Sequence, residues 1–255
     1  MCLVALAWKA RPRWRLLLAG NRDELHERPT APLARWAAPA DSVLAGRDLR
    51  SGGSWVGLGS DGRAAVVTNV RDPFATASGS PRGHLIADYL AGSLDARAYA
   101  YDLATAADEF PPFNLLLCDD QRCEHLSNHP PLERMLAPGI HGMSNGPLDA
   151  QWPKTAALTM VLRDWCAADS GDLQPLWTAL GNPATAPDVQ LPHTGVDLSC
   201  ERLLSAAFIN GTSYGTRAST LIAVDHQGHG LIHERRFGPN GVFQGETRLE
   251  ISGAH

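Results

Sequence analysis

The sequence has few lysines, no long apolar run and no secretory leader, and each shortage argues against a class of protein. Lysine occurs only at positions 9 and 154 and the net charge is −5, so neither a nucleic acid nor an anionic membrane surface is expected as the main partner. No apolar run reaches the roughly 18 residues that a membrane-spanning helix needs. Without a charged leader and a cleavage site at the N-terminus, we expect a soluble, cytoplasmic protein.

Metal and cofactor motifs are also missing. The five cysteines are an odd set without metal-ligand spacing, and Cys118 and Cys166 lie in apolar patterns that are typical of small core residues. His226 and His229 belong to a turn and are too loosely spaced to predict a metal site. No glycine-rich dinucleotide loop and no serine nucleophile elbow occur. The sequence therefore predicts neither a metal nor a cofactor.

The start of the chain contains two apolar stretches of strand length, residues 2–8 and 14–20, separated by a basic turn at 9–13. This pattern predicts a β-hairpin. Cys2 opens the first strand, and the polar cluster at 21–24 closes the second. Antiparallel pairing would therefore place the thiol beside these charged residues.

The remaining pattern alternates between hairpins and helices. Expected strands are residues 43–48, 55–59, 64–70, 114–118, 123–127, 219–225, 230–237 and 241–251, and 139–145 is expected to pair with the hairpin at 114–127. Expected helices lie at 83–92, 94–110, from 152 through 165, and 173–180, whereas the proline-containing segment 25–39 is expected to be irregular. This order predicts one α+β domain over residues 1–255, with antiparallel sheets between helix layers.

Cys2 has the strongest chemical argument of the cysteines. If Met1 is removed, residue 2 carries both a thiol and a free α-amine, which titrates at about 7.7 to 8.0 and is partly free base at neutral pH. Such a residue can deprotonate its own thiol, attack a carbonyl and return the proton to a leaving amine. The alternative is a structural cysteine behind a retained Met1.

Seven ordered motifs give the chain a resemblance to a known family. They are Met1-Cys2, Asn21-Arg22-Asp23-Glu24, Gly52-Gly53-Ser54-Trp55-x-Gly57, Thr68-Asn69-x-Arg71, Phe113-Asn114-Leu115-Leu116, Ser144-Asn145-Gly146-x-Leu148-Asp149 with Trp152-Pro153-Lys154, and Thr216-Arg217-Ala218-Ser219-Thr220. The sequence is similar to the NRDE family, also called the transport and Golgi organisation family. It more faintly resembles the N-terminal-nucleophile hydrolases of the penicillin V acylase and bile salt hydrolase group.

The fainter resemblance implies a fold and a set of site residues. The fold is a four-layer αββα sandwich of two antiparallel sheets. Asp23 and Glu24 are alternatives for the site acid, because the hydrolases space their arginine and acid differently. The implied catalytic residues are Cys2, Arg22, Asp23, Glu24, Asn69, Asn145 and Arg217, and the implied substrate-binding residues are Asn21, Trp55, Arg71 and His84.

Two functions follow from these resemblances. The first is hydrolysis of a small linear amide or acyl compound through a thioester on Cys2. The second is a non-catalytic protein that binds or carries haem or an acyl lipid in the same pocket, which the family's associations with haem movement and lipid balance imply. Nothing in the sequence predicts the oligomeric state.

Overall fold

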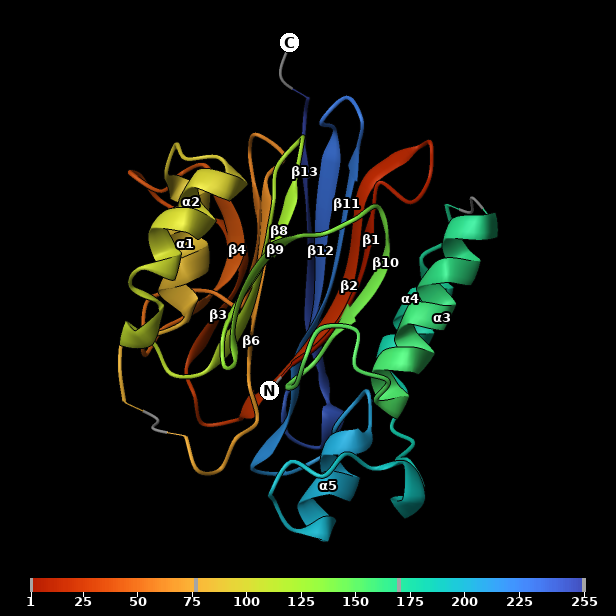
Figure 1. Cartoon of the computed structure of the whole chain (residues 1–255). Helices are drawn as coiled ribbons and strands as arrows, with labels where there is room; N and C mark the ends of the chain where they lie inside the picture. Colours follow the sequence, from red (N-terminus) through yellow and green to blue (C-terminus); the bar gives the residue numbers. More distant parts are fainter. Residues whose placement is uncertain (1, 76–77, 169–170, 254–255) are drawn as a thin grey trace.

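The computed structural model describes residues 2–75, 78–168 and 171–253, and for Cys2 it describes the backbone alone. Within these residues the strands form two sheets in which every neighbouring pair is antiparallel. Four layers are stacked as helices, sheet, sheet and helices (Figure 1). The predicted αββα architecture is confirmed.

The six-stranded sheet contains both ends of the described chain, and its central strands are long. Its order is β10 (Gly139–Met143), β1 (Cys2–Trp8), β2 (Trp14–Leu25), β11 (Tyr214–Asp225), β12 (Gly230–Phe237) and β13 (Phe243–Ile251). The seven-stranded sheet follows the sequence order: β3 (Thr30–Arg35), β4 (Val43–Asp48), β5 (Val56–Gly59), β6 (Ala64–Asn69), β7 (Phe113–Cys118), β8 (Cys123–Asn128) and β9 (Pro131–Met135).

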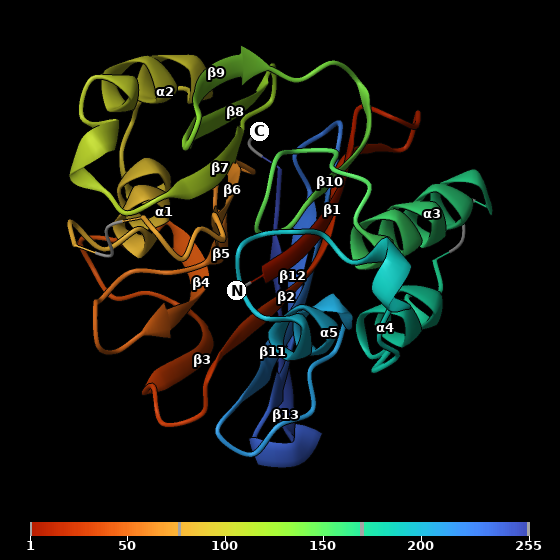
Figure 2. The same ribbon diagram turned by 60° about the horizontal axis from the view of Figure 1, so that its bottom comes forward.

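Helices cover the outer face of each sheet, as Figures 1 and 2 show. On the seven-stranded sheet lie α1 (Gly83–Ala91) and α2 (Ala96–Ala104), and on the six-stranded sheet lie α3 (Pro153–Ala168) and α4 (Gln174–Leu180). A further helix, α5 (Leu198–Ser205), and three short 3-10 helices, Ala107–Glu109, Asp188–Gln190 and Pro239–Gly241, complete the described elements.

Alternating strand residues create three apolar layers. The central one lies between the sheets and includes Leu6, Leu18, Trp55 and Leu116. Residues of opposite parity on the same strands pack under the helices, so the central strands of each sheet are buried on both faces. Among the described residues, no helix has the length and apolar character needed to cross a membrane.

Several local predictions were wrong. The segment 25–39 contains the strand β3, which tolerates Pro32 because an edge strand needs fewer N–H donors. The strand β10 pairs with β1 and not with the β7–β8 hairpin, whose actual neighbour is the unpredicted edge strand β9. The predicted helix at 94–110 is divided between α2 and a 3-10 turn.

The helices α3 and α5 add two corrections. The buried side of α3 includes Leu158 and Leu162, whereas Met160, expected on that side, is exposed. The helix α5 was not predicted, since it is short and follows a proline-rich segment. These differences concern edges and surfaces, where long-range packing decides the structure.

Candidate active site

The polar cluster at residues 21–24 lies inside the strand β2 and not after its end. Its backbone pairs with β1 on one side and β11 on the other, and Cys2 is directly opposite Arg22. The predicted pairing of the chain start with the polar cluster is therefore confirmed for the main chain. Met1 and the Cys2 side chain, on which the proposed chemistry depends, lie outside the described part.

A cavity of about 420 Å³ lies between the ends of β2, β4 and β6 and the start of α1. It contains more arginines than carboxylates, which gives its walls a surplus of positive charge at neutral pH. Its lining residues are Arg22, Asp23, Glu24, Arg28, Asp48, Arg50, Ser51, Ser54, Trp55, Val67, Asn69, Gly79, Ser80, Pro81, Arg82, Gly83 and Pro111.

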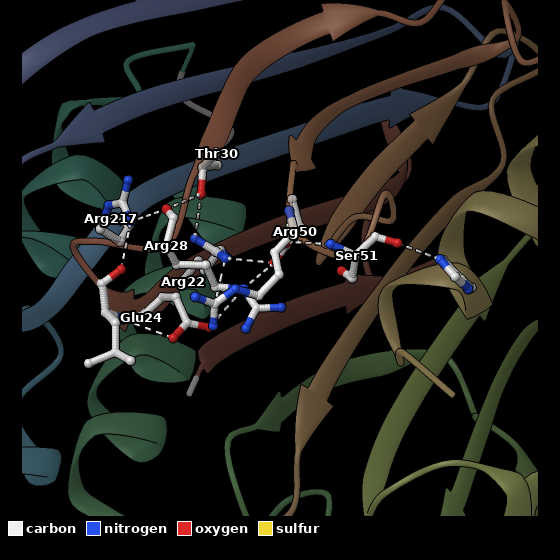
Figure 3. A network of polar contacts seen from close by, with 10 residues as sticks. Arg22, Glu24, Arg28, Thr30, Arg50, Ser51 and Arg217 are labelled. Atoms are coloured by element: carbon white, nitrogen blue, oxygen red, sulfur yellow. Dashed lines mark hydrogen bonds and ion pairs between the residues drawn. The ribbon is translucent and has the colours of Figure 1, made fainter. Parts of the chain in front are cut away.

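Arg22 lines this cavity and belongs to the network of polar contacts in Figure 3. Its Nη2 lies 3.3 Å from Oδ2 of Asp48, and its Nη1 donates to Oγ1 of Thr30 at 3.4 Å. The guanidinium carbon lies 4.4 Å from the ring centroid of Trp55, in a cation–π arrangement. The same Asp48 oxygen is 2.5 Å from Nε of Arg28. One carboxylate oxygen is thus shared by two arginines.

Asp48 also organises the turn after β4. Its Oδ1 accepts hydrogen bonds from the backbone N–H groups of Arg50 and Ser51, which places both residues at the cavity wall. Burial raises the pKa of this carboxyl, but the hydrogen bond and charge of Arg28 outweigh it, and the pKa lies below its usual value. Asp48 therefore stays ionised, which keeps both arginines in place.

The two alternatives for the site acid have different surroundings. The Oδ1 of Asp23 accepts a hydrogen bond from Oγ1 of Thr216 at 2.6 Å, and the residue is almost fully buried. Burial raises the pKa of Asp23, while the nearby positive charge of Lys154 acts in the opposite direction. In contrast, Oε2 of Glu24 forms ion pairs at 3.8 Å with Nη2 of Arg22 and with Nε of Arg28.

The turn that follows β10 contains Asn145 and is fastened to the seven-stranded sheet. The side-chain Nδ2 of Asn145 donates to the backbone carbonyl oxygen of Asn69 at 2.8 Å. The backbone carbonyl of Asn145 accepts from the N–H of Arg71 at 2.7 Å. The hydroxyl of Thr68 donates to the carbonyl of Ser144 at 2.7 Å. Asn145 and Asn69 are therefore brought together, and Asn69 lies on the cavity wall.

A buried polar pair supports the other side of this turn. Nδ2 of Asn114 donates to the carbonyl of Gly146 at 2.9 Å, and Oδ1 of Asn114 lies 3.2 Å from Nε2 of His125. Burial and the positive charge of Arg134 lower the pKa of His125 to about 4. His125 is therefore neutral at physiological pH.

Arg71 lies apart from the residues that line the cavity. It forms an ion pair with Glu201 of α5, with Nη1 2.6 Å from Oε2, and both side chains are only 5% exposed. Oε1 of Glu201 accepts from the N–H and hydroxyl of Thr194, and Arg71 lies over the ring of Trp152 at 5.2 Å. In this structure Arg71 links three segments of the chain.

Three further residues expected at the site are not among those that line the cavity. Nη1 of Arg217 donates to the carbonyls of Leu25 and Arg28, and so holds the β2–β3 turn behind Arg22 (Figure 3). Nε2 of His84 lies 2.6 Å from the carbonyl of Ser51. Nδ2 of Asn21 donates to two carbonyls on the helix side of β2, those of residues 180 and 207.

The sequence argument missed Asp48, Arg28 and Lys154. Asp48 ends a predicted strand, but its role depends on the neighbouring strand β3, which was not predicted. Lys154 is one of only two lysines and directly follows Trp152-Pro153. The rarity of lysine was the signal that the composition offered, and the structure buries Lys154 in the first turn of α3.

Comparison with known proteins identifies the family of this chain. The family model described as Transport and Golgi organisation 2 matches residues 1–239. The chain belongs to this family. The human Transport and Golgi organization protein 2 homolog is 29% identical over 269 residues, covering 97% of each chain, and the mouse homolog is 27% identical over 258 residues, covering 92% of each. The Drosophila melanogaster protein is 28% identical over 149 residues, covering 51% of this chain and 52% of its own.

The family fold has a neighbour among solved hydrolases. The crystal structure of a C2A mutant of conjugated bile acid hydrolase from Clostridium perfringens aligns with a TM-score of 0.55 and 10% identity, over 97% of this chain and 92% of that chain. At this identity the likeness establishes the fold alone. The αββα sandwich of this family member is thus a fold that it shares with this hydrolase.

Proposed function

We propose that this chain is an N-terminal cysteine hydrolase that cleaves a linear amide or related acyl compound through a thioester on Cys2. The observation that carries the proposal is the position of the cavity. It lies where the main chain of Cys2 pairs with that of Arg22, and Arg22, Asp23 and Asn69 line it. The bile acid hydrolase structure was solved as a mutant of its own residue 2, named C2A, which makes residue 2 the natural place to test.

In the proposed reaction, removal of Met1 leaves a free α-amine on Cys2, and this amine accepts the thiol proton. The thiolate forms a bond with the substrate carbonyl carbon, whose π electrons move to oxygen. Collapse of this intermediate breaks the bond to the leaving amine, which receives the proton from the α-amine. Water then cleaves the thioester and restores the thiol.

The proposed roles of the other residues follow from their surroundings. Arg22 favours the thiolate, because a neighbouring cation lowers a thiol pKa. Asp23 suits the acid that orients the α-amine, since Glu24 already faces two arginines. Asn145 has a second amide N–H that is not used by Asn69 and that we assign to the oxyanion. Loss of such a donor typically lowers the rate about 10²- to 10³-fold.

The walls of the cavity suggest an anionic substrate with an apolar part. Arg22, Arg28 and Arg50 line one side, and planar guanidinium groups suit a carboxylate or phosphate. A narrow apolar pocket shares Arg22 and Trp55 with the cavity and continues between the sheets along Val4 and Leu18. The buried Nε1 of Trp55 has no acceptor in the described part of the chain, so a substrate group there would satisfy it.

The proposal is tested by a screen of N-acyl amino acids, acyl-CoAs and β-lactams with wild type and Cys2→Ala. We expect turnover by wild type, a covalent acyl adduct on Cys2 in mass spectrometry, and loss of both in Cys2→Ala. Cys200→Ala is the matched control, since Cys200 is the half-buried thiol of α5, and it should retain activity. Turnover that survives Cys2→Ala, or an adduct on another cysteine, would refute the assignment.

The same surplus of arginines supports a second candidate, a non-catalytic carrier of haem or an acyl lipid. Such a carrier needs the cavity and its charges but not the nucleophile. Titration with haem and with a long-chain acyl-CoA separates the two candidates. Stoichiometric binding that Cys2→Ala leaves unchanged, without any turnover, would favour the carrier.

A further inference from the structure

Cys118 and Cys123 face each other across the β7–β8 hairpin, remote from the residues of the cavity. They are direct partners in the strand register, and their Sγ atoms lie 2.6 Å apart. This separation is about 0.6 Å longer than a disulfide bond of about 2.05 Å. Two thiols held this close need little movement to become bonded.

The hairpin geometry suits a cross-strand bond. The N–H of Asp119 donates to the carbonyl of Arg122, so these two residues form the hydrogen-bonded pair that closes the turn. By the alternation of antiparallel pairs, Cys118 and Cys123 form the adjacent non-hydrogen-bonded pair, in which Cα atoms are about 4.5 Å apart. That value falls within the range of about 4.4 to 6.8 Å found in disulfides.

Hydrogen bonds from two neighbouring residues hold the pair in place. The carbonyl of Cys118 accepts from the hydroxyl of Tyr89, and the carbonyl of Cys123 accepts from the N–H of Leu136. The thiols lie in the central apolar layer and are at most 3% exposed. In the described ranges, no third histidine, cysteine, aspartate or glutamate completes a metal-like cluster with them. A bond between the two sulfurs is therefore the chemistry this arrangement favours over metal binding.

We propose that Cys118 and Cys123 form a reversible disulfide when the protein meets a small-molecule disulfide as oxidant. One protein thiolate attacks the oxidant, forms a mixed disulfide and releases one small thiolate. The second cysteine loses its proton and attacks the protein sulfur of that mixed disulfide, which forms the Cys118–Cys123 bond and releases the second small thiol. Two protein thiols are oxidised, and one small disulfide is reduced to two thiols.

The pair lies next to an exposed part of the seven-stranded sheet. The hairpin turn at residues 120–121 is exposed, and the neighbouring strand β9 is exposed at every position at the edge of the seven-stranded sheet (Figure 2). Burial and the adjacent Cys118 raise the pKa of Cys123, with Glu124 and Asp119 adding to the effect. We therefore expect oxidation to be slow at neutral pH and to accelerate as the pH rises.

The sequence provides a direct readout, because trypsin cleaves after Arg122, between the two cysteines. Cleavage after Arg97, Arg122 and Arg134 places Cys118 in the peptide 98–122 and Cys123 in the peptide 123–134. A disulfide joins these peptides in a non-reducing digest, and reduction separates them.

The experiment uses the full chain with Cys2→Ala, treated with oxidised glutathione at about pH 8.5, where thiols begin to ionise, until Cys200 has reacted fully. We expect the joined peptides to be at least about tenfold more abundant than any cross-link to Cys166 or Cys200, because the hairpin pair meets the disulfide geometry. Cys200→Ala should retain the cross-link, whereas Cys118→Ala and Cys123→Ala should abolish it.

The opposite result is equally clear. If Cys200 carries glutathione while the peptides 98–122 and 123–134 stay separate, with both thiols free for alkylation after unfolding, the proposal is wrong. The peptide pattern of the chain that keeps both hairpin cysteines decides this even if Cys118→Ala or Cys123→Ala fails to fold. The result is independent of whether Cys2 is a nucleophile.

Discussion

Arg22 and Arg71 are buried to nearly the same degree, with side chains 6% and 5% exposed, and each lies over a tryptophan ring. They differ in how their charge is balanced. Arg71 has Glu201 at 2.6 Å, and Thr194 holds the same carboxylate. Arg22 shares the carboxylates of Asp48 and Glu24 with Arg28 and faces a cavity with further arginines. Burial of an arginine alone thus does not distinguish the two positions, whereas a neighbouring cavity with more arginines than carboxylates does.

Removal of the carboxylate that pairs with Arg71 should cause the largest loss of stability. Glu201→Gln leaves a buried cation without its carboxylate, and we expect the free energy of unfolding to fall by about 3–5 kcal/mol. Urea denaturation measures this loss. The control is Asp188→Asn, which breaks the exposed ion pair between Asp188 and Arg202. Arg202 lies on α5 beside Glu201, and this variant should leave the free energy of unfolding unchanged. Equal effects of the two variants would contradict the structural role of Arg71.

The second effect is a loss of stability at low pH, and it concerns the buried pair of His125 and Asn114. Because the folded pKa of His125, about 4, lies below the ordinary 6.5, the unfolded chain binds the proton more readily. Stability is therefore complete above about pH 6.5 and decreases as the pH falls toward 4, by about 3 kcal/mol for a shift of this size. Denaturation between pH 7 and 4 should show a smaller decrease for His125→Asn than for wild type.

Its control is His226→Gln, which changes an exposed histidine of the β11–β12 turn. This variant should retain the wild-type dependence on pH. If His125→Asn also retains it, protonation of His125 is not the cause of the acid sensitivity.

The smallest effect on stability is expected at Arg22 itself. In Arg22→Met, Asp48 keeps its contact with Arg28, so the loss of stability should be well below that of Glu201→Gln. Affinity for an N-acyl amino acid, measured by calorimetry, should instead fall about 10- to 100-fold, the usual range for losing a charged hydrogen bond. Arg47→Met is the matched control, because Arg47 lies over Trp36 but outside the cavity lining. Comparable affinity of both variants would remove Arg22 from the binding site.

Local pattern predicted much of the sandwich. The strand β4 was predicted with the bounds it has, and the opening hairpin was predicted with its pairing, since alternating apolar residues and short turns specify both. The edge strands β3 and β9 were missed because prolines at positions 32 and 131 weaken a strand pattern that neighbouring strands restore. The partner of β10 could not be predicted, because β1 lies far away in sequence.

The site residues also divide into those that sequence motifs predicted and those whose contacts depend on the fold. Trp55 and Asn69 were expected at the site from motifs, and both line the cavity. The role of Asp48 depends on Arg22, which approaches it only when the sheets stack, and on Arg28, which the pairing of β3 with β4 brings close. The pairing of Arg71 with Glu201 likewise joins the segment after β6 to a helix that was not predicted. Sequence motifs therefore indicated residue types, while the fold determined which charges meet.

The turn at residues 144–146 belongs by chain to the six-stranded sheet but hydrogen-bonds to the segments that extend from β6 and β7 of the other sheet. Thr68, Arg71 and Asn114 each donate to one of its three carbonyls, and Asn145 donates back to Asn69. Sliding of one sheet over the other would break all of these bonds together. We therefore expect the two sheets to move as a single body at this end, so that any change in cavity shape would come from the loops around it.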